Sequence, residues 1–219
     1  MKLTILAIDY LYALYLKLVS YFIRPRHYIE GIESPSGTVI LIPGVYENGF
    51  YFSKLSRRLE DAGYAVINAE LLTEQQPVVA SAKCINSYIN DKGLKNVILI
   101  GHSSGGLIAV VCLDLNRQVI RKAIAIATPF SGVYSGHLLR TKLVKELLPN
   151  SELILSINKL SQSPMQSKVI SIFPRFDNQV WHHQGSKFAG ATNIELTASG
   201  HHLVLNSHEL SDIIIESIV

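Results

Sequence analysis

The sequence is poor in cysteine and in charge, and both shortages exclude classes of protein. It has two cysteines, no Cys-x-x-Cys pair and no Cys/His cluster. We therefore interpret Cys84 and Cys112 as buried reduced thiols and expect neither a structural zinc nor any other metal. Charged residues make up 17% of the chain, the formal net charge is +3, and no basic run occurs. Nothing in this pattern indicates a nucleic-acid partner.

The chain is rich in apolar residues instead. Hydrophobic residues account for 48% of the 219 positions, and the mean hydropathy is +0.25. The length fits one domain of ordinary size, with no internal repeat and no low-complexity linker. Part of the apolar excess lies at the N-terminus, and the rest lies in short runs typical of strands buried on both faces.

The N-terminal segment is long enough to cross a bilayer. Residues 3–23 are mostly apolar, but Asp9 and Lys17 interrupt them, and an unpaired charge near a membrane centre is costly. Tyrosines, which favour the membrane interface, lie in or beside the segment, and basic residues follow it. They are Tyr10, Tyr12, Tyr15, Tyr21, Tyr28, Arg24 and Arg26.

Three interpretations of this segment compete. A cleaved signal peptide is disfavoured, because only one lysine precedes the apolar run and no A-x-A site follows it. A single membrane anchor would leave the following domain in the cytoplasm, given the basic flank. A helix lying on the membrane or on the protein itself would place Asp9 and Lys17 within roughly 80° of each other. We expect an N-terminal helix over 1–30, a main domain over 31–219 and membrane association, with a soluble cytoplasmic protein as the alternative.

The main domain alternates between two patterns. Short β-branched runs predict six strands, and apolar spacing of three and four residues predicts helices between them. Such alternation predicts an α/β fold: a mostly parallel six-stranded sheet with helices on both faces and little or no lid. The predicted strands are 38–42, 64–68, 96–100, 122–127, 169–173 and 193–197, and the predicted helices are 52–59, 78–89, 107–115, 139–147 and 207–218.

One strand runs directly into the pattern Gly-x-Ser-x-Gly. Strand 96–100 is followed by Gly101-His-Ser103-Ser-Gly105-Gly and then by an apolar helix. Glycines on both sides let the two elements approach around a strained serine, and the start of the helix offers N–H groups to a developing oxyanion. The context predicts that Ser103 is a nucleophile.

A nucleophilic serine needs a base, and the base needs an acid to orient it. Asp177 follows the strand over 169–173, and His201 follows the strand over 193–197. His202 is adjacent to His201, so only one of them can face Ser103, and we favour His201. Glu195 is a weaker alternative acid, because it lies inside a predicted strand.

The remaining candidates concern the oxyanion and the substrate. The backbone N–H of Ser104 is one expected oxyanion donor, and the loop after the first strand supplies the second, from Val45 or else Tyr46. We interpret His102 as packing the turn, and the pair at 182–183 lacks a carboxylate for metal binding. Four aromatic residues are expected either to form an apolar acyl site or to belong to the core: Tyr46, Phe50, Phe130 and Trp181.

Five blocks in order now carry a family resemblance: residues 41–48, 101–106, 127–132, 176–177 and 199–201. Over about 38–219, the chain resembles a bacterial α/β-hydrolase of the lipase/esterase-like family. The resemblance implies Ser103 as nucleophile, Asp177 as acid, His201 as base, and Val45 and Ser104 as oxyanion donors. Two features depart from the family: Pro43 replaces the usual histidine of the oxyanion loop, and the lid segment is short.

The expected activity is cleavage of carboxylic esters, of lipid-like or medium acyl chain, through an acyl-enzyme and without a cofactor. An acyltransferase or thioesterase with the same triad is the first alternative, and a catalytically silent membrane-associated scaffold is the second. The sequence does not determine the oligomeric state, the acyl length or the leaving group.

Overall fold

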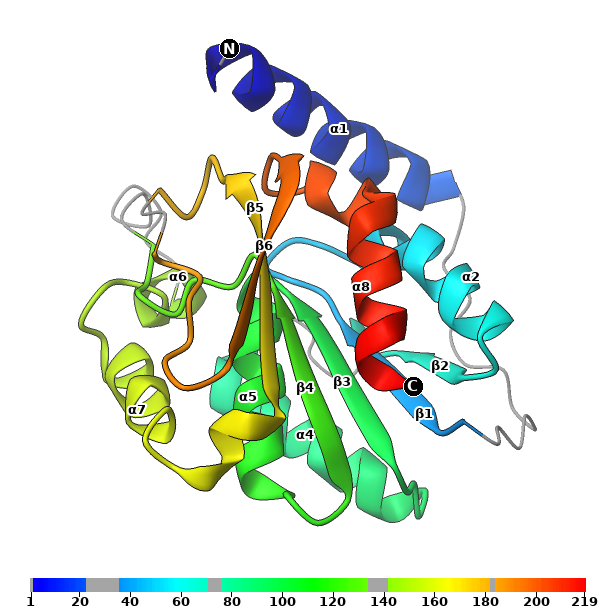
Figure 1. The fold of residues 1–219 in the computed structure, drawn as a ribbon. Coiled ribbons are helices and arrows are strands. Elements are labelled where there is room, and N and C mark those ends of the chain that lie inside the picture. Colours follow the sequence, from blue (N-terminus) through cyan, green and yellow to red (C-terminus); the bar gives the residue numbers. More distant parts are fainter. Residues whose placement is uncertain (1, 23–35, 71–75, 134–141, 182–183) are drawn as a thin grey trace.

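A six-stranded parallel sheet forms the centre of the computed structural model, which describes residues 2–22, 36–70, 76–133, 142–181 and 184–219 (Figure 1). The strand order is β2-β1-β3-β4-β5-β6, and every neighbouring pair is parallel. All six predicted strands are confirmed, although β5 continues to Phe176. They are β1 Thr38–Ile42, β2 Ala65–Asn68, β3 Val97–His102, β4 Ile120–Ile126, β5 Val169–Phe176 and β6 Thr192–Ser199.

Helices connect the strands, as the apolar spacing predicts. The α-helices are α1 Lys2–Phe22, α2 Ser53–Asp61, α4 Val78–Asp91, α5 Ser104–Leu115, α6 Lys142–Glu146, α7 Glu152–Leu160 and α8 His208–Ile218, with short 3-10 helices η1 Gly49–Phe52, η3 Pro164–Lys168 and η4 Leu203–Asn206. Helix α7 was not predicted. It begins after Ser151, whose side chain accepts a hydrogen bond from the N–H of Ile154, as an N-cap does.

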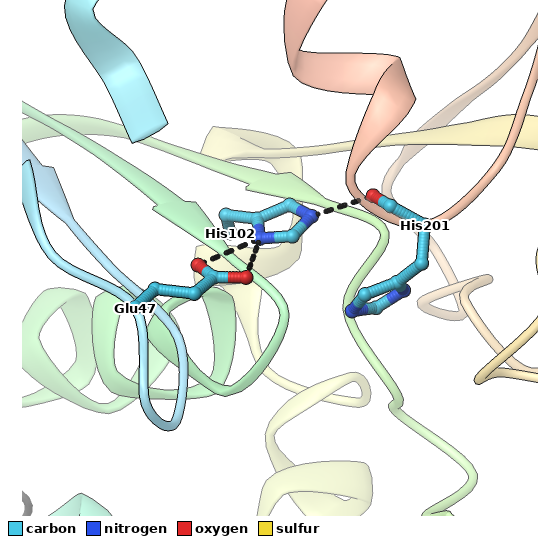
Figure 2. A group of neighbouring side chains, drawn as sticks. All are labelled: Glu47, His102 and His201. Carbon is cyan, nitrogen blue, oxygen red and sulfur yellow. Dashed lines mark hydrogen bonds and ion pairs between the residues drawn. The ribbon is translucent and has the colours of Figure 1, made fainter. Parts of the chain in front are cut away.

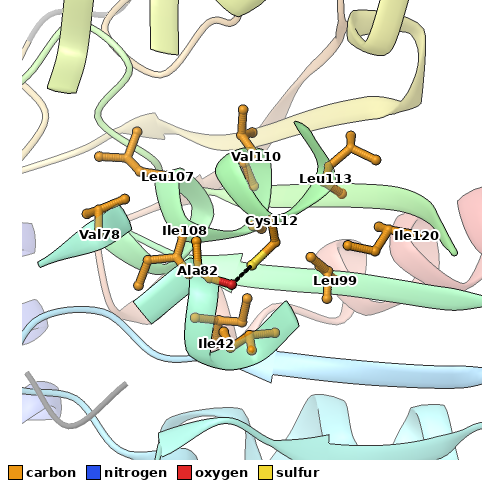
Figure 3. Packing of buried hydrophobic residues seen from close by; sticks show 14 of the residues in the cluster. Ile42, Val78, Ala82, Leu99, Leu107, Ile108, Val110, Cys112, Leu113 and Ile120 are labelled. Carbon is orange, nitrogen blue, oxygen red and sulfur yellow. Dashed lines mark hydrogen bonds between the residues drawn. The ribbon is translucent and has the colours of Figure 1, made fainter. Parts of the chain in front are cut away.

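The sheet separates two apolar cores, which is why its strands are hydrophobic on both faces. On one face α4, α5 and α7 pack over residues such as Ile42 and Leu99 (Figure 3). On the other face α2 and α8 cover Val39 and Ile98. Burial of each such side chain contributes about 1.5–3 kcal/mol of transfer free energy.

Both cysteines are free thiols in the described part of the chain. Cys112 is fully buried, its Sγ donates to the carbonyl oxygen of Ala82 at 3.4 Å (Figure 3), and burial raises the pKa of its thiol. Cys84 is half-buried. The thiol of Cys112 therefore acts as a small core side chain.

Because all strands are parallel, their carboxyl ends share one edge of the sheet. The loops after β1, β3, β5 and β6 all open at this edge, which is where ligands bind in open α/β sheets. Helix α1 crosses the same edge beside the tips of β5 and β6 (Figure 1) and contacts η1 and η4.

Candidate active site

Ser103 lies at the turn between β3 and α5 in a strained conformation. Its φ is 54° and its ψ is −124°, and its N–H donates to the carbonyl oxygen of Ile126 at 2.8 Å. A Cβ on Gly101 would lie 2.1 Å from the carbonyl oxygen of Gly105, so the turn closes only with glycine at position 101. This is the geometry of a nucleophile elbow, which exposes a serine at the end of a strand.

Asp177 and His201 form a buried hydrogen-bonded pair at the ends of β5 and β6. The Nδ1 of His201 lies 3.0 and 2.9 Å from the two carboxylate oxygens of Asp177. Asp177 also accepts hydrogen bonds from the N–H groups of Gln179 and Val180, both at 2.8 Å. Burial alone raises the pKa of Asp177, but the charge and hydrogen bond of His201 outweigh it, so the pKa falls below its usual value. The carboxylate therefore stays ionised and orients the imidazole.

This pairing fixes the role of each nitrogen of His201. Because the carboxylate of Asp177 accepts a hydrogen bond, Nδ1 of His201 is the donor, and Nε2 is the nitrogen left to exchange a proton. The structure thus pairs Asp177 with His201, and His202 has a different partner. No hydrogen bond joins Ser103 to His201 among the described residues, and such bonds often tighten only when substrate binds.

The loop after β1 packs against the elbow. A Cβ on Gly44 would lie 2.9 Å from the Cβ of Ser103. The loop turns tightly, since the N–H of Glu47 donates to the carbonyl oxygen of Gly44 at 3.2 Å and Tyr46 has a φ of 62°. Within the described residues, the N–H groups of Val45 and Ser104 have no hydrogen-bond acceptor.

His102 does more than pack the turn. Its Nδ1 lies 2.8 and 2.9 Å from the carboxylate oxygens of Glu47, and its Nε2 lies 2.9 Å from the backbone oxygen of His201 (Figure 2). Both neighbours are acceptors, so both nitrogens carry a proton and the ring is a cation. The pair is fully enclosed, with 0% and 3% of the two side chains exposed.

The pKa directions agree with a buried ion pair. Burial alone lowers the pKa of His102, but the charge and hydrogen bond of Glu47 raise it above its usual value. Burial alone raises the pKa of Glu47, but the charge on His102 and the hydrogen bond from it lower the pKa to about 2. Glu47 also accepts the N–H of Gly44 at 2.8 Å. The Glu47–His102 pair therefore links the loop after β1 to the histidine loop, defined here as residues 200–203.

The same cluster has the composition of a metal site. One ligand atom each from Glu47, His102 and His201 lies within 4.8 Å of the others. However, both nitrogens of His102 already donate to protein acceptors, and Nδ1 of His201 donates to Asp177. A metal ion would have to displace these bonds, so the cluster fits a histidine cation better than a metal.

Asp9 of α1 is a second buried carboxylate at this edge. Its Oδ1 accepts from the N–H groups of His202 and Leu203 at 2.8 and 2.9 Å. Its Oδ2 accepts from Nδ1 of His202 at 2.9 Å and from the side-chain amide of Asn178 at 3.1 Å. Burial raises the pKa of Asp9, but these bonds and the charge of His202 lower it to about 2. The partner of His202 is therefore Asp9.

Asn178, which follows β5, links the histidine loop to α1. Its side-chain oxygen accepts the N–H of His201 at 3.0 Å while its amide donates to Asp9. Sequence analysis missed Asp9, Glu47 and Asn178. For Asp9 the available signal is a lone acid inside an apolar helix, a pattern that by itself indicates a charge interrupting a membrane segment. The division into 1–30 and 31–219 stays a prediction, but α1 contributes directly to the histidine loop.

The candidate acyl-site residues are dispersed. Phe130 is buried and packs on Phe188 with ring centroids 4.8 Å apart, and Phe50 is half-buried against the second core. Tyr46 is 49% exposed and Trp181 is 69% exposed. Trp181 lines a cavity of about 310 Å³ together with Asp177, but neither Ser103 nor His201 is among its lining residues. A role of these aromatics in substrate binding stays a prediction.

One other candidate lies away from this cluster. Glu195, the alternative acid, is exposed on β6, and the carboxylate that pairs with His201 is that of Asp177. Residues 182–183 lie outside the described part of the chain.

Acid is expected to destabilise the protein through the buried carboxylates. Asp9 and Glu47 have pKa values of about 2 in the folded protein, against 3.8 and 4.5 without these partners, as in the unfolded chain. Their contributions to stability are complete above the unfolded values and are lost as pH falls toward 2, by about 2 kcal/mol for Asp9 and about 3 kcal/mol for Glu47. Urea unfolding across this range should show the decline. Asp9→Asn should be less stable near neutral pH and should decline less, and an unchanged profile would contradict the assignment.

Comparison with known proteins supports the fold. A family model described as a PGAP1-like alpha/beta domain matches residues 54–139. Comparison with curated proteins gave no match. An α/β-hydrolase enzyme from a metagenome of lagoon sediments of Mar Chica, Morocco, is 16% identical with a TM-score of 0.63, covering 88% of this chain and 97% of its own.

Two lipases give similar values. The monoacylglycerol lipase of Paleococcus ferrophilus is 16% identical with a TM-score of 0.61, covering 84% of this chain and 95% of its own. The mature lipase of Bacillus licheniformis is 12% identical with a TM-score of 0.64, covering 87% and 95%. With the parallel sheet and the elbow between β3 and α5, these matches show that the chain has the α/β-hydrolase fold and resembles lipases and esterases in structure.

Proposed function

We propose that the protein is a serine hydrolase that cleaves carboxylic esters. Ser103 is the nucleophile, His201 the general base and Asp177 the acid that orients it. The observation that carries the proposal is the buried Asp177–His201 pair, in which Asp177 holds Nδ1 and leaves Nε2 as the nitrogen that can act as base, at the edge of the sheet where the strained Ser103 lies. The lipase neighbours support an ester substrate.

In the proposed reaction, Oγ of Ser103 attacks the acyl carbonyl carbon while Nε2 of His201 takes the hydroxyl proton. The N–H groups of Val45 and Ser104 stabilise the oxyanion. The tetrahedral intermediate collapses, and the alcohol leaves with the proton from His201. Water, activated by the same base, then attacks the acyl-enzyme, releasing the carboxylic acid and restoring Ser103.

We further propose that the substrates are lipid-like and that the protein works at a membrane. Helix α1 is long and apolar enough over Lys2–Ser20 to cross a membrane by length and composition alone. Its position at the carboxyl edge of the sheet brings an apolar surface close to the proposed active site.

The decisive experiment compares wild type with Ser103→Ala on p-nitrophenyl esters of increasing acyl length. We expect the substitution to lower kcat by at least about 10³-fold. Labelling by a fluorophosphonate probe should disappear in the same variant. Activity that survives Ser103→Ala would overturn the nucleophile assignment. Wild type that labels but transfers acyl groups to added alcohols faster than to water would replace hydrolysis by acyl transfer.

A further inference from the structure

Helix α1 places its apolar side chains outward and its acidic side chain inward. The inward face consists of Asp9 and Leu16, both buried, with half-buried residues between them. The outward side is a row of exposed large hydrophobic residues, which we call the outer face: Leu3, Leu6, Ile8, Tyr10, Leu11, Leu14, Tyr15, Leu18 and Phe22. This is the reverse of a helix on a soluble domain, which turns its polar residues toward water.

An apolar surface of this extent marks an interaction site. It occupies one helix along its whole length, which is a shape that suits a flat partner. Two of its members are tyrosines, which favour the membrane–water interface. The outer face therefore has the composition of a helix that inserts shallowly into lipid.

The charges around the outer face select the kind of lipid. Within α1 the basic residues are Lys2 and Lys17, and the only acidic residue is Asp9. Asp9 is buried against the histidine loop, and Lys2 and Lys17 are exposed. Every accessible formal charge of α1 is thus positive, which complements an anionic surface.

The contacts of α1 with the main domain decide how it meets the lipid. Asp9 accepts four hydrogen bonds from Asn178, His202 and Leu203. Further along the helix, the hydroxyl of Tyr51 donates to the backbone oxygen of Ala13 at 3.1 Å, and Lys17 lies 5.8 Å from the ring centre of Tyr46. These contacts hold α1 along the domain over several turns.

A helix that crossed the bilayer would have to break these contacts. Asp9 would leave four donors and enter hydrocarbon, where an ionised carboxylate is strongly disfavoured. A helix lying in the plane of the membrane keeps all of them and still buries the outer face. The two arrangements therefore differ in whether Asp9 keeps its four hydrogen bonds to the main domain.

We infer that α1 docks on an anionic lipid surface with its outer face inserted and its axis in the membrane plane, while Asp9 keeps it attached to the histidine loop. Only the purpose of this arrangement rests on the proposed function; the docking itself does not. It brings the carboxyl edge of the sheet, with Ser103 and His201, to the level of the lipid headgroups.

The first test uses the full chain in vesicle flotation. Wild type should float with vesicles of phosphatidylcholine and phosphatidylglycerol and bind less to phosphatidylcholine alone. The double variant Leu11→Glu/Leu14→Glu should partition at least about tenfold more weakly. The matched control Val79→Glu/Leu155→Glu changes exposed apolar residues on α4 and α7 and should bind as wild type does.

Hydrolysis of a short soluble ester separates the two proposals. Both double variants should retain it, because neither changes a residue of the proposed active site. Loss of flotation with intact hydrolysis supports the docking surface. Flotation that is unaffected by the outer-face substitutions overturns it, as does a wild-type dimer in solution that those substitutions dissociate without any vesicle binding.

A depth measurement distinguishes a helix in the plane from one that spans. Single tryptophans replace Leu3, Leu11 or Leu18 in a Trp181→Phe background, and brominated lipids quench their fluorescence. An in-plane helix gives the same shallow depth at the three positions. A depth that is greatest at position 11 and small at the other two would show a spanning helix and overturn the inference.

Discussion

Replacing His201 by asparagine is expected to lower kcat/KM for ester hydrolysis by about 10⁴-fold or more, because it removes the base. An asparagine amide can replace the Nδ1 donor of histidine but has no counterpart of Nε2. The bond to Asp177 therefore survives, and protein stability should change little. Hydrolysis rates and urea unfolding of the same variant measure the two effects separately.

The adjacent histidine provides the matched control. His202→Asn also keeps a donor at the Nδ1 position, here toward Asp9, and loses Nε2, which lies 3.7 Å from Glu47. We expect kcat/KM to fall by less than about tenfold, since this ring supports the loop and does not face Asp177. The reverse ranking of the two variants would transfer the role of base to His202.

Replacing Glu47 by leucine is expected to destabilise the fold by about 3–5 kcal/mol, because the charge on His102 would stay buried without its partner. The N–H of Gly44 would lose its acceptor as well. Glu47→Gln should cost less, since an amide oxygen still accepts from Nδ1. Urea unfolding near neutral pH measures both variants.

The pH dependence of the Glu47 pair tests the same point. The pairing lowers the pKa of Glu47 to about 2 and raises the pKa of His102. The pair therefore stabilises the folded protein above the unfolded pKa of Glu47, and this stabilisation is lost as pH rises through the folded pKa of His102.

Combining Glu47→Leu with His102→Leu should restore part of the stability lost in Glu47→Leu, as removal of both charges of a buried pair does. A double variant that is less stable than wild type by the full sum of the two single effects would show that the two residues do not interact.

The elements of the sheet follow from local sequence. Runs such as 38–42 and 96–100 are apolar and β-branched over four or five positions, so they predict strands that are buried on both faces. Helix α7 was missed because residues 131–167 show no sustained period, and a single N-cap at Ser151 is a weak signal.

The active-site candidates were predictable for a related reason. In a parallel sheet every strand ends at the same edge, so residues that directly follow strands converge even when the chain separates them widely. Ser103 follows β3, and Asp177 and His201 follow β5 and β6. Position along the chain was therefore enough to propose these three together, and the contact between Asp177 and His201 is as expected.

The sequence by itself determined the sheet, the elbow at Ser103 and the order of the serine, the acid and the histidine, because each is a local pattern or follows from strand order. Only the tertiary structure decided which carboxylates pair with His102 and His202. Asp9 and His202 are 193 positions apart, and Glu47 and His102 are 55 apart. Their pairing depends on where α1 and the loop after β1 dock, and burial then requires each charge to find a partner. No local sequence pattern indicates these pairings.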